Sequence, residues 1–215
     1  MNNKNKFYIP LIACRERQNY IDELVHMVRI DDVFYDDEHR GPLGNTIRAL
    51  ESDKCKNCDY IMMLQDDCIP CNNLIEICSQ IVEAHPDNVI AMFPWDFLKN
   101  SPCEEVDTPF YEADIVSGLG LILPQKYLEN YLRFAKSSPS YFEDSTMKMF
   151  CEKYKIRMIQ TIPALVQHRQ GKSILAPELK QEFRITKYFT KNPVADWSND
   201  RVISLEEYNY KRFYL

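Results

Sequence analysis

The sequence predicts an α/β fold, in which a mixed, mainly parallel sheet is flanked by helices in a single domain. Three observations predict it. Short apolar segments alternate with segments whose apolar residues have helical spacing. Several apolar segments run directly into acidic or other polar residues, as buried parallel strands do at their carboxyl ends. The 215 residues are few enough to share one hydrophobic core.

Each predicted strand in the first half of the chain is a short apolar run, and each precedes a segment with helical spacing. The second of these helices is expected to follow turn residues at 41–45. The strands are expected at 7–14, 32–35 and 60–64, and the helices at 21–28, 47–50 and 74–82.

The second half continues the alternation, so one main domain is expected over 1–175. Residues 176–215 are expected to form an extension that packs on this domain or completes it. Pro124 is a favourable first residue for a helix. The strands are expected at 89–93, 114–123 and 156–162, and the helices at 124–132 and 143–154.

Composition excludes some classes of protein. The 26 Lys and Arg residues are outnumbered by 32 Asp and Glu residues, which excludes a surface built wholly for polyanions. No apolar run approaches the ~20 residues that span a bilayer, and no secretory signal pattern is found. We therefore expect a cytoplasmic protein without a membrane span, and its eight cysteines are expected to be reduced thiols.

Asp66 and Asp67 follow the most apolar predicted strand, 60–64. Two adjacent carboxylates raise each other's pKa unless a positive charge lies beside them, so the pair favours a bound cation. Mg²⁺ and Mn²⁺ use one or two carboxylates together with substrate phosphates, and ligands of open α/β sheets bind beyond the strand carboxyl ends. The alternative is that the pair only caps the following helix.

The segment 60–70, Tyr-Ile-Met-Met-Leu-Gln-Asp-Asp-Cys-Ile-Pro, resembles the strand and Asp-x-Asp motif of glycosyltransferases with the GT-A fold, which is Rossmann-like. Further stretches occur in the order that this resemblance requires. They look like the first nucleotide-binding strand and loop (9–17), the donor-sugar and acceptor wall (117–124), the acidic catalytic motif (142–144) and a late histidine-bearing strand and loop (163–173).

The resemblance implies a metal-dependent transferase that uses Mn or Mg and a nucleotide-diphosphate sugar, with a UDP-sugar as the expected donor. Asp67 and His168 would bind the metal, and Asp66 would hold the ribose or the sugar. Gln65 departs from the pattern, because an acidic residue often stands there. This leaves the metal with fewer protein carboxylates.

Other residues are implied as donor contacts. Arg15 and Asp36 stand at the ends of the first two predicted strands and are expected to contact the nucleotide. Gly118 would allow close approach of the donor, although a strand glycine also suits a bulge. Lys172, together with Arg169, would take up charge on the leaving diphosphate.

Glu143 and Asp144 correspond to the motif that supplies the catalytic base in inverting members of the family. Asp144 is the expected base, with Glu143 as the other candidate; either would accept the proton of the acceptor hydroxyl. Acidic residues in the first turn of a helix are also favoured by the helix dipole, whatever their function.

The cysteines offer an alternative of another class. Cys55-x-x-Cys58 and Cys68-x-x-Cys71 have the spacing of a four-thiolate zinc site, which would make the chain a zinc-stabilised nucleic-acid-binding module without catalytic activity. A strand over 60–65 would hold the two pairs about 20 Å apart, which opposes a shared zinc ion.

The acceptor stays open at the level of sequence. A glycan is one candidate. The aromatic and cationic segment 208–215 suggests another, a DNA acceptor carrying a hydroxylated base.

Overall fold

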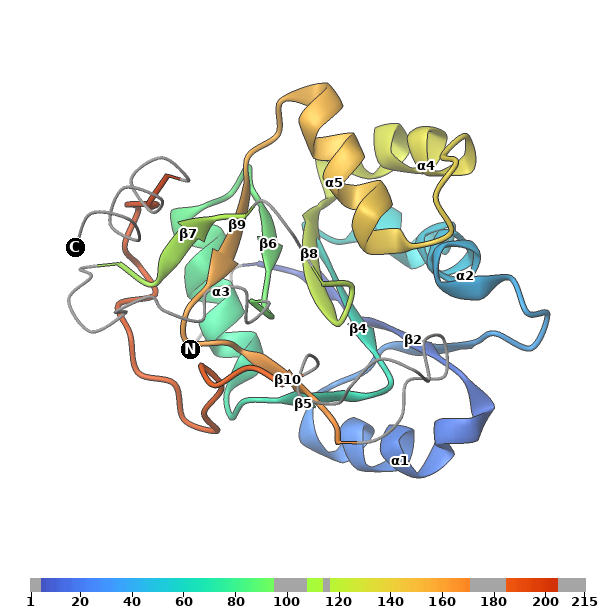
Figure 1. Ribbon diagram of the computed structural model, residues 1–215, viewed down its shortest axis with the longest axis horizontal. Helices are drawn as coiled ribbons and strands as arrows, with labels where there is room; N and C mark the ends of the chain where they lie inside the picture. The colour runs from blue at the N-terminus through green and yellow to red at the C-terminus, as the bar shows by residue number, and fades with distance from the viewer. Residues whose placement is uncertain (1–4, 95–107, 114–116, 171–184, 205–215) are drawn as a thin grey trace.

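The computed structural model describes residues 5–94, 108–113, 117–170 and 185–204 (Figure 1). Within these residues an eight-stranded sheet has the order β3-β2-β4-β8-β6-β9-β7, with β1 paired to β4. Its strands are β1 (Phe7–Tyr8), β2 (Pro10–Ala13), β3 (Asp32–Tyr35), β4 (Tyr60–Gln65), β6 (Val89–Ala91), β7 (Phe110–Glu112), β8 (Gly120–Pro124) and β9 (Met158–Thr161). A second, two-stranded sheet pairs β5 (Cys68–Pro70) with β10 (Val166–His168).

The directions of the strands make the main sheet mixed. β1, β2, β3 and β4 pair in parallel, and so do β6 and β9. β8 runs antiparallel to both of its neighbours, β4 and β6, and β7 runs antiparallel to β9. The predicted class, a mixed and mainly parallel sheet with flanking helices, is confirmed.

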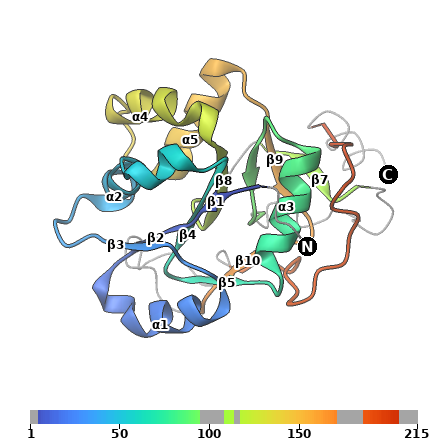
Figure 2. The ribbon, with the colours of Figure 1, turned by 180° about the vertical axis from the view of Figure 1, so that it is seen from behind.

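Helices cover both faces of this sheet (Figures 1 and 2). Ile61 and Met63 of β4 belong to a core shared with one group of helices, whereas Met62 and Leu64 belong to the core on the other face. This is the alternation of a strand that is buried on both sides. The first group is α2 (Gly41–Leu50), α4 (Leu128–Lys136) and α5 (Glu143–Tyr154); the second is α1 (Gln18–Met27) and α3 (Leu74–Ala84).

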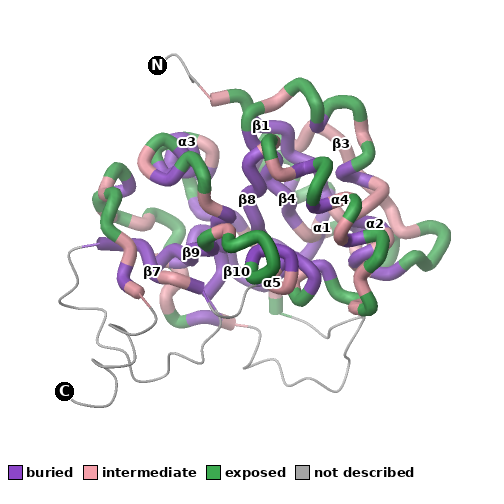
Figure 3. Tube along the Cα trace, turned by 90° about the horizontal axis from the view of Figure 1, so that it is seen from above, coloured by how far each residue is buried: buried purple, intermediate pink, exposed green. Residues whose placement is uncertain are grey.

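Short 3₁₀ turns and the late segment complete the described structure. The 3₁₀ turns are η1 (Arg15–Arg17), η2 (Asp53–Asn57) and η5 (Gln125–Tyr127). Trp197 is buried in the core that contains α1 and α3, and Ile203 forms a bridge to β7. Residues 185–204 therefore pack against the sheet through these two residues. Figure 3 shows that the central strands β4 and β8 are buried. None of the helices in the described ranges has the length and apolar character that crossing a membrane requires.

Several element boundaries differ from the sequence prediction. Pro124 ends β8 instead of opening a helix, and α4 begins at Leu128, after η5. The expected turn at 41–45 is the first half of α2, which starts at Gly41 in a left-handed conformation (φ 75°). Asp36 accepts hydrogen bonds from the amides of Arg40 and Gly41, which explains how the helix can begin before its apolar face does. Strand β8 begins at Gly120 rather than at 114, and β7 is an additional strand.

Candidate active site

The candidate site lies where the carboxyl ends of β2 and β4 meet the start of β8 and the first turn of α5. Because β8 is antiparallel to β4, its first residue pairs with the end of β4: Gly120 lies opposite Leu64. The amide of Gln65 then donates to the carbonyl of Leu119 (3.1 Å). The polar residues that follow β4 are thus brought next to the loop that precedes β8.

Asp66 and Asp67 are buried, and one arginine lies between their carboxylates. The Nη1 atom of Arg17 is 2.7 Å from Oδ1 of Asp66 and 3.0 Å from Oδ2 of Asp67. Asp66 also accepts hydrogen bonds through Oδ2 from the amide (2.7 Å) and the thiol (3.1 Å) of Cys14. The cation that the acidic pair requires is therefore supplied, in the protein alone, by Arg17 of η1.

The electrostatics of this cluster hold Cys14 and Arg17 in defined protonation states. Burial acts to lower the pKa of Arg17, but Asp67 and Asp66 outweigh it and raise the pKa above the usual value. Burial, with the nearby charge of Asp66, raises the pKa of Cys14 to about 12. Cys14 therefore stays a protonated thiol that donates to Asp66, and Arg17 stays charged.

His168 reaches this cluster through the two-stranded sheet. In the β5–β10 pairing His168 lies opposite Cys68, and the carbonyl of Asp67 accepts from the amide of Arg169 (2.7 Å). The Nδ1 atom of His168 lies 3.5 Å from Oδ2 of Asp67. The ring is buried and packs edge-on against Phe93 (5.0 Å between ring centroids). The predicted proximity of His168 and Asp67 is thus present in the structure.

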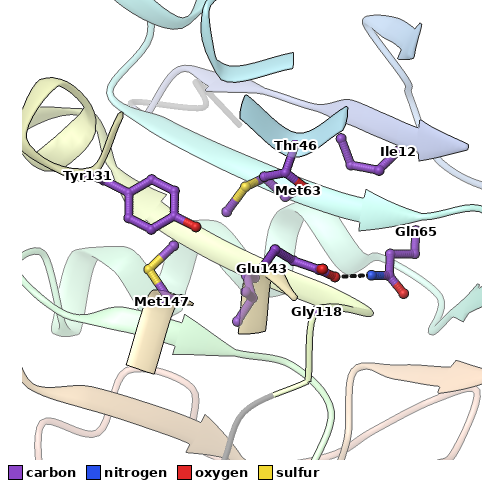
Figure 4. A pocket seen from close by; sticks show the side chains of 9 residues that line it. Ile12, Thr46, Met63, Gln65, Gly118, Tyr131, Glu143 and Met147 are labelled. Carbon is purple, nitrogen blue, oxygen red and sulfur yellow. Dashed lines mark hydrogen bonds between the residues drawn. The ribbon is translucent and has the colours of Figure 1, made fainter. Parts of the chain in front are cut away.

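Glu143, at the start of α5, is buried and faces the end of β4. It accepts a hydrogen bond from Nε2 of Gln65, as Figure 4 shows. Burial, the charge of Asp144 and a smaller effect of Asp67 raise the pKa of Glu143 to about 7. A Cβ at Gly118 would lie 2.7 Å from Cδ of Glu143 and 2.8 Å from Nε2 of Gln65. The absence of a side chain at Gly118 therefore leaves the space that this hydrogen bond occupies.

Asp144 differs from its neighbour because it is only partly buried. Its Oδ1 accepts hydrogen bonds from the amide (2.5 Å) and hydroxyl (3.2 Å) of Ser145. Burial raises the pKa of Asp144, and the hydrogen bonds from Ser145 oppose part of that rise. Of the two acidic residues, Asp144 is the one that a molecule arriving from solvent can contact.

Other predicted site residues have partners elsewhere. Arg15 forms a bidentate pair with Asp37 (2.6 and 2.8 Å) and stacks over Tyr35, at the exposed end of β2 and β3. Asp36 caps α2, as described above. Lys172 and segment 208–215 lie outside the described residues.

Arg169, predicted as a contact for the leaving diphosphate, is turned toward α1. Its Nη1 atom lies 2.6 Å from Oε2 of Glu23, and its guanidinium stacks over Tyr20. The predicted interaction with a diphosphate would require this side chain to leave α1.

Arg17 and Cys14 are the members of the cluster that sequence reasoning did not select. A signal was present, because both residues lie in the stretch 9–17 that resembles a nucleotide-binding loop. Adjacent carboxylates such as Asp66 and Asp67 need a positive charge nearby, and an arginine at the end of a neighbouring strand can supply it.

The cysteines do not form the alternative zinc site. Cys55 belongs to η2 and precedes β4, whereas Cys68 belongs to β5 and follows it, so the two pairs stand at opposite ends of a six-residue strand. Such a strand is about 20 Å long, and one zinc ion holds its sulfurs within about 2.3 Å. Throughout the described ranges, no group of three or more His, Cys, Asp or Glu side chains is arranged to hold a metal ion.

No protein-family model matches this sequence, and no curated protein matches it. Similar solved structures include A197 from STIV, at 15% identity over 88% of this chain and 96% of that chain, with a TM-score of 0.49. A glycosyltransferase involved in glycosylation of the major capsid of PBCV-1 has 10% identity, coverage of 80% and 98%, and a TM-score of 0.38.

A third similar structure is a mutant of Drosophila β1,4-galactosyltransferase 7 in complex with manganese, UDP-Gal and xylobiose. It has 10% identity, coverage of 89% of this chain and 84% of that chain, and a TM-score of 0.43. Similarities at this level do not assign an activity. The chemistry has to be argued from the residues of the site.

Proposed function

We propose that this protein is a glycosyltransferase that moves a sugar from a nucleotide-diphosphate donor to an acceptor hydroxyl. The observation that carries the proposal is the convergence of an Asp66–Arg17–Asp67 cluster with an acidic helix start at the carboxyl ends of β2 and β4. Ligands of open α/β sheets bind at such strand ends. The cluster suits a charged diphosphate, and the acidic helix start suits a proton transfer.

The donor diphosphate is proposed to bind at Arg17. A guanidinium is a suitable partner for phosphate oxygens because its N–H groups match their geometry. Arg17 is held between two carboxylates, so its position is defined before the donor arrives. Asp66, fixed by the amide of Cys14, would hold a hydroxyl of the ribose or the sugar.

His168 and Asp67 could hold a divalent ion only if the substrate supplies the remaining ligands of that ion. Nδ1 of His168 and Oδ2 of Asp67 are 3.5 Å apart, less than twice the ~2.1 Å ligand distance of Mg²⁺, so both atoms could contact one ion. Magnesium usually takes its remaining ligands from phosphates and water. When bound, such an ion would neutralise charge on the leaving diphosphate.

Asp144 is proposed as the general base. The acceptor oxygen forms a bond to the anomeric carbon, the bond from that carbon to the diphosphate oxygen breaks, and the acceptor proton passes to the Asp144 carboxylate. The nucleotide diphosphate leaves with the bonding electrons beside Arg17. Direct displacement of this kind inverts the anomeric carbon.

The acceptor is proposed to be a glycan. Tyr141 and Phe142 directly precede the acidic pair, and they are 53% and 46% exposed, with ring centroids 5.4 Å apart. These two exposed rings, next to the proposed base, are proposed to form part of the acceptor surface. A DNA acceptor is the less favoured alternative, because the net charge of −6 opposes binding to phosphates.

The test is a thermal-shift screen of nucleotide-diphosphate sugars with and without Mn²⁺. A ligand that binds only the folded protein raises its apparent stability, by about 2.7 kcal/mol at a hundredfold excess over Kd. We expect at least one donor, a UDP-sugar, to raise Tm, and to do so more strongly with Mn²⁺. A complete screen without a shift would refute the proposal.

Two variants separate donor binding from chemistry. Asp67→Asn is expected to abolish the Mn²⁺-dependent part of the shift and the turnover, because it removes a charged ligand. Asp144→Asn is expected to keep the shift and to lose turnover by ~10²-fold or more, the usual contribution of a general base. Full transfer activity in Asp144→Asn would exclude Asp144 as the base.

A further inference from the structure

A small cavity lies behind the acidic helix start, between the sheet and helices α2, α4 and α5. Its walls include Thr46, Gln65, Tyr131, Glu143 and Met147 (Figure 4). The cavity volume is about 10 Å³, which is the room that one water molecule requires. A water molecule also needs two to four polar partners, and these walls provide hydroxyl, carboxylate and amide groups.

Tyr131 has no hydrogen-bond partner within the described residues, although its side chain is 0% exposed. Figure 4 shows its hydroxyl directed into the cavity, on the side of Glu143. A buried hydroxyl without a hydrogen-bond partner destabilises the folded state, so native proteins almost always satisfy it. Burial raises the pKa of Tyr131, so the hydroxyl keeps its proton and is a donor.

We propose that this cavity binds one water molecule that joins the Tyr131 hydroxyl to the Glu143 carboxylate, which makes Tyr131 a positioning residue for the acidic start of α5. Tyr131 donates to the water, and the water donates to the carboxylate. Thr46 supplies a further polar contact from α2.

The bridge has a defined effect on Glu143. The groups that face Glu143 are Asp144 on its own helix, Asp67 beyond β4, the neutral amide of Gln65 and the phenol of Tyr131. The two aspartates oppose ionisation of Glu143. A hydrogen bond from Gln65 and a bridging water both favour the carboxylate. Removing the Tyr131 hydroxyl should therefore make Glu143 a weaker acid.

Tyr131→Phe is the direct test, because it removes only the hydroxyl. The ring also packs edge-on against Phe150 (5.3 Å between ring centroids), and phenylalanine retains that contact. The carboxyl carbon of Glu143 is followed by NMR in protein with ¹³C-labelled glutamate and is assigned from its loss in Glu143→Gln. We expect the pKa of Glu143 to rise by about half a unit to one unit, the value of one modest hydrogen bond.

Two further variants make the result decisive. Thr46→Val should raise the same pKa by a smaller amount, and it replaces Tyr131→Phe if that variant does not fold. Tyr127→Phe is the matched control, because this hydroxyl donates to the carbonyl of Asp87, away from the cavity, and should leave Glu143 unchanged. An unchanged pKa in Tyr131→Phe, or in Thr46→Val where that variant stands in for it, would overturn the proposal.

The titration does not depend on the proposed function, since it is measured without donor or acceptor. Only the consequence for catalysis rests on glycosyl transfer: Tyr131→Phe should lower kcat, because the start of α5 that carries the proposed base Asp144 loses a positioning contact, and should leave donor affinity within about twofold. If Tyr131→Phe shifts the pKa of Glu143 but the protein binds no donor, the proposal of a water bridge stands and the proposed transferase function is refuted.

Discussion

Two arginines of one short turn have different surroundings. Arg15 is largely exposed and pairs with Asp37, whose carboxylate is also exposed. Arg17, two residues later, is largely buried and contacts both Asp66 and Asp67. Exposed ion pairs contribute little energy, whereas a buried guanidinium is screened less by water. We therefore propose Arg17 as the diphosphate contact, whereas the sequence alone suggested Lys172 and Arg169 for the diphosphate and Arg15 for the nucleotide.

Substitution of these arginines tests that assignment. Arg17→Gln should weaken the binding of inorganic pyrophosphate at least about tenfold, because hydrogen bonds to charged groups contribute ~1.5–3 kcal/mol. Arg15→Gln is the matched control and should stay within about threefold of the original affinity. Isothermal titration calorimetry of both variants provides the comparison. Equal losses of affinity would contradict a special role for Arg17.

At the scale of elements, helix α5 is seated against the loop before β8 through a close contact. Glu143 in its first turn receives the hydrogen bond from Gln65 in a space that Gly118 leaves open. The position of the acidic helix start relative to β4 thus depends on a glycine that belongs to neither element.

Gly118→Ala should destabilise the fold by ~1–3 kcal/mol, the usual cost of inserting an atom into a packed site. Its Cβ would lie 2.7 Å from Cδ of Glu143, so the first turn of α5 must shift. In a double-mutant cycle followed by urea unfolding, Glu143→Ala should relieve most of this cost, because it removes the atoms that clash. If the unfolding free-energy changes of Gly118→Ala and Glu143→Ala simply add in the double variant, Gly118 does not act through Glu143.

The sequence predicts elements well where a local pattern defines them. β4 and α3 were expected within one or two residues, because a continuous apolar run and a helical spacing are local properties. The start of α2 was missed because Asp36 caps it from outside the helix. The antiparallel direction of β8 was not predicted either, since strand direction is decided by pairing with distant strands.

The same limit applies to the site. Asp66, Asp67 and His168 could be selected because acidic pairs and a histidine after an apolar strand are visible in the sequence. The partners of Arg17 and Gly118 lie about 50 and 25 residues away, so a local pattern can mark these residues but does not show which side chains they contact.

At the scale of the whole molecule, Glu143 couples stability to pH. Its pKa is raised from 4.5 to about 7 in the folded protein. The folded state therefore binds more protons than the unfolded state between these values, and stability falls as pH rises through that interval. The penalty is absent below about pH 4.5 and complete above about pH 7; its upper limit is ~3 kcal/mol.

Glu143→Gln should remove this pH dependence. Relative to the original protein, the variant should gain up to ~3 kcal/mol of unfolding free energy between pH 4.5 and pH 8. Urea unfolding at both values measures the difference, and Glu129→Gln, at an exposed position of α4, is the control. If the difference in unfolding free energy between Glu143→Gln and the original protein is the same at both pH values, the pKa of Glu143 is not raised.

The pairing of β5 with β10 also has a consequence for biosynthesis. Cys68 and His168 are partners in this small sheet, yet the ribosome makes them a hundred residues apart. A nascent polypeptide that has already formed β4 carries its acidic pair without the histidine. The cluster of Asp66, Asp67 and His168 can thus form only after residue 168 has been synthesised, when the strands of the main sheet have already been made.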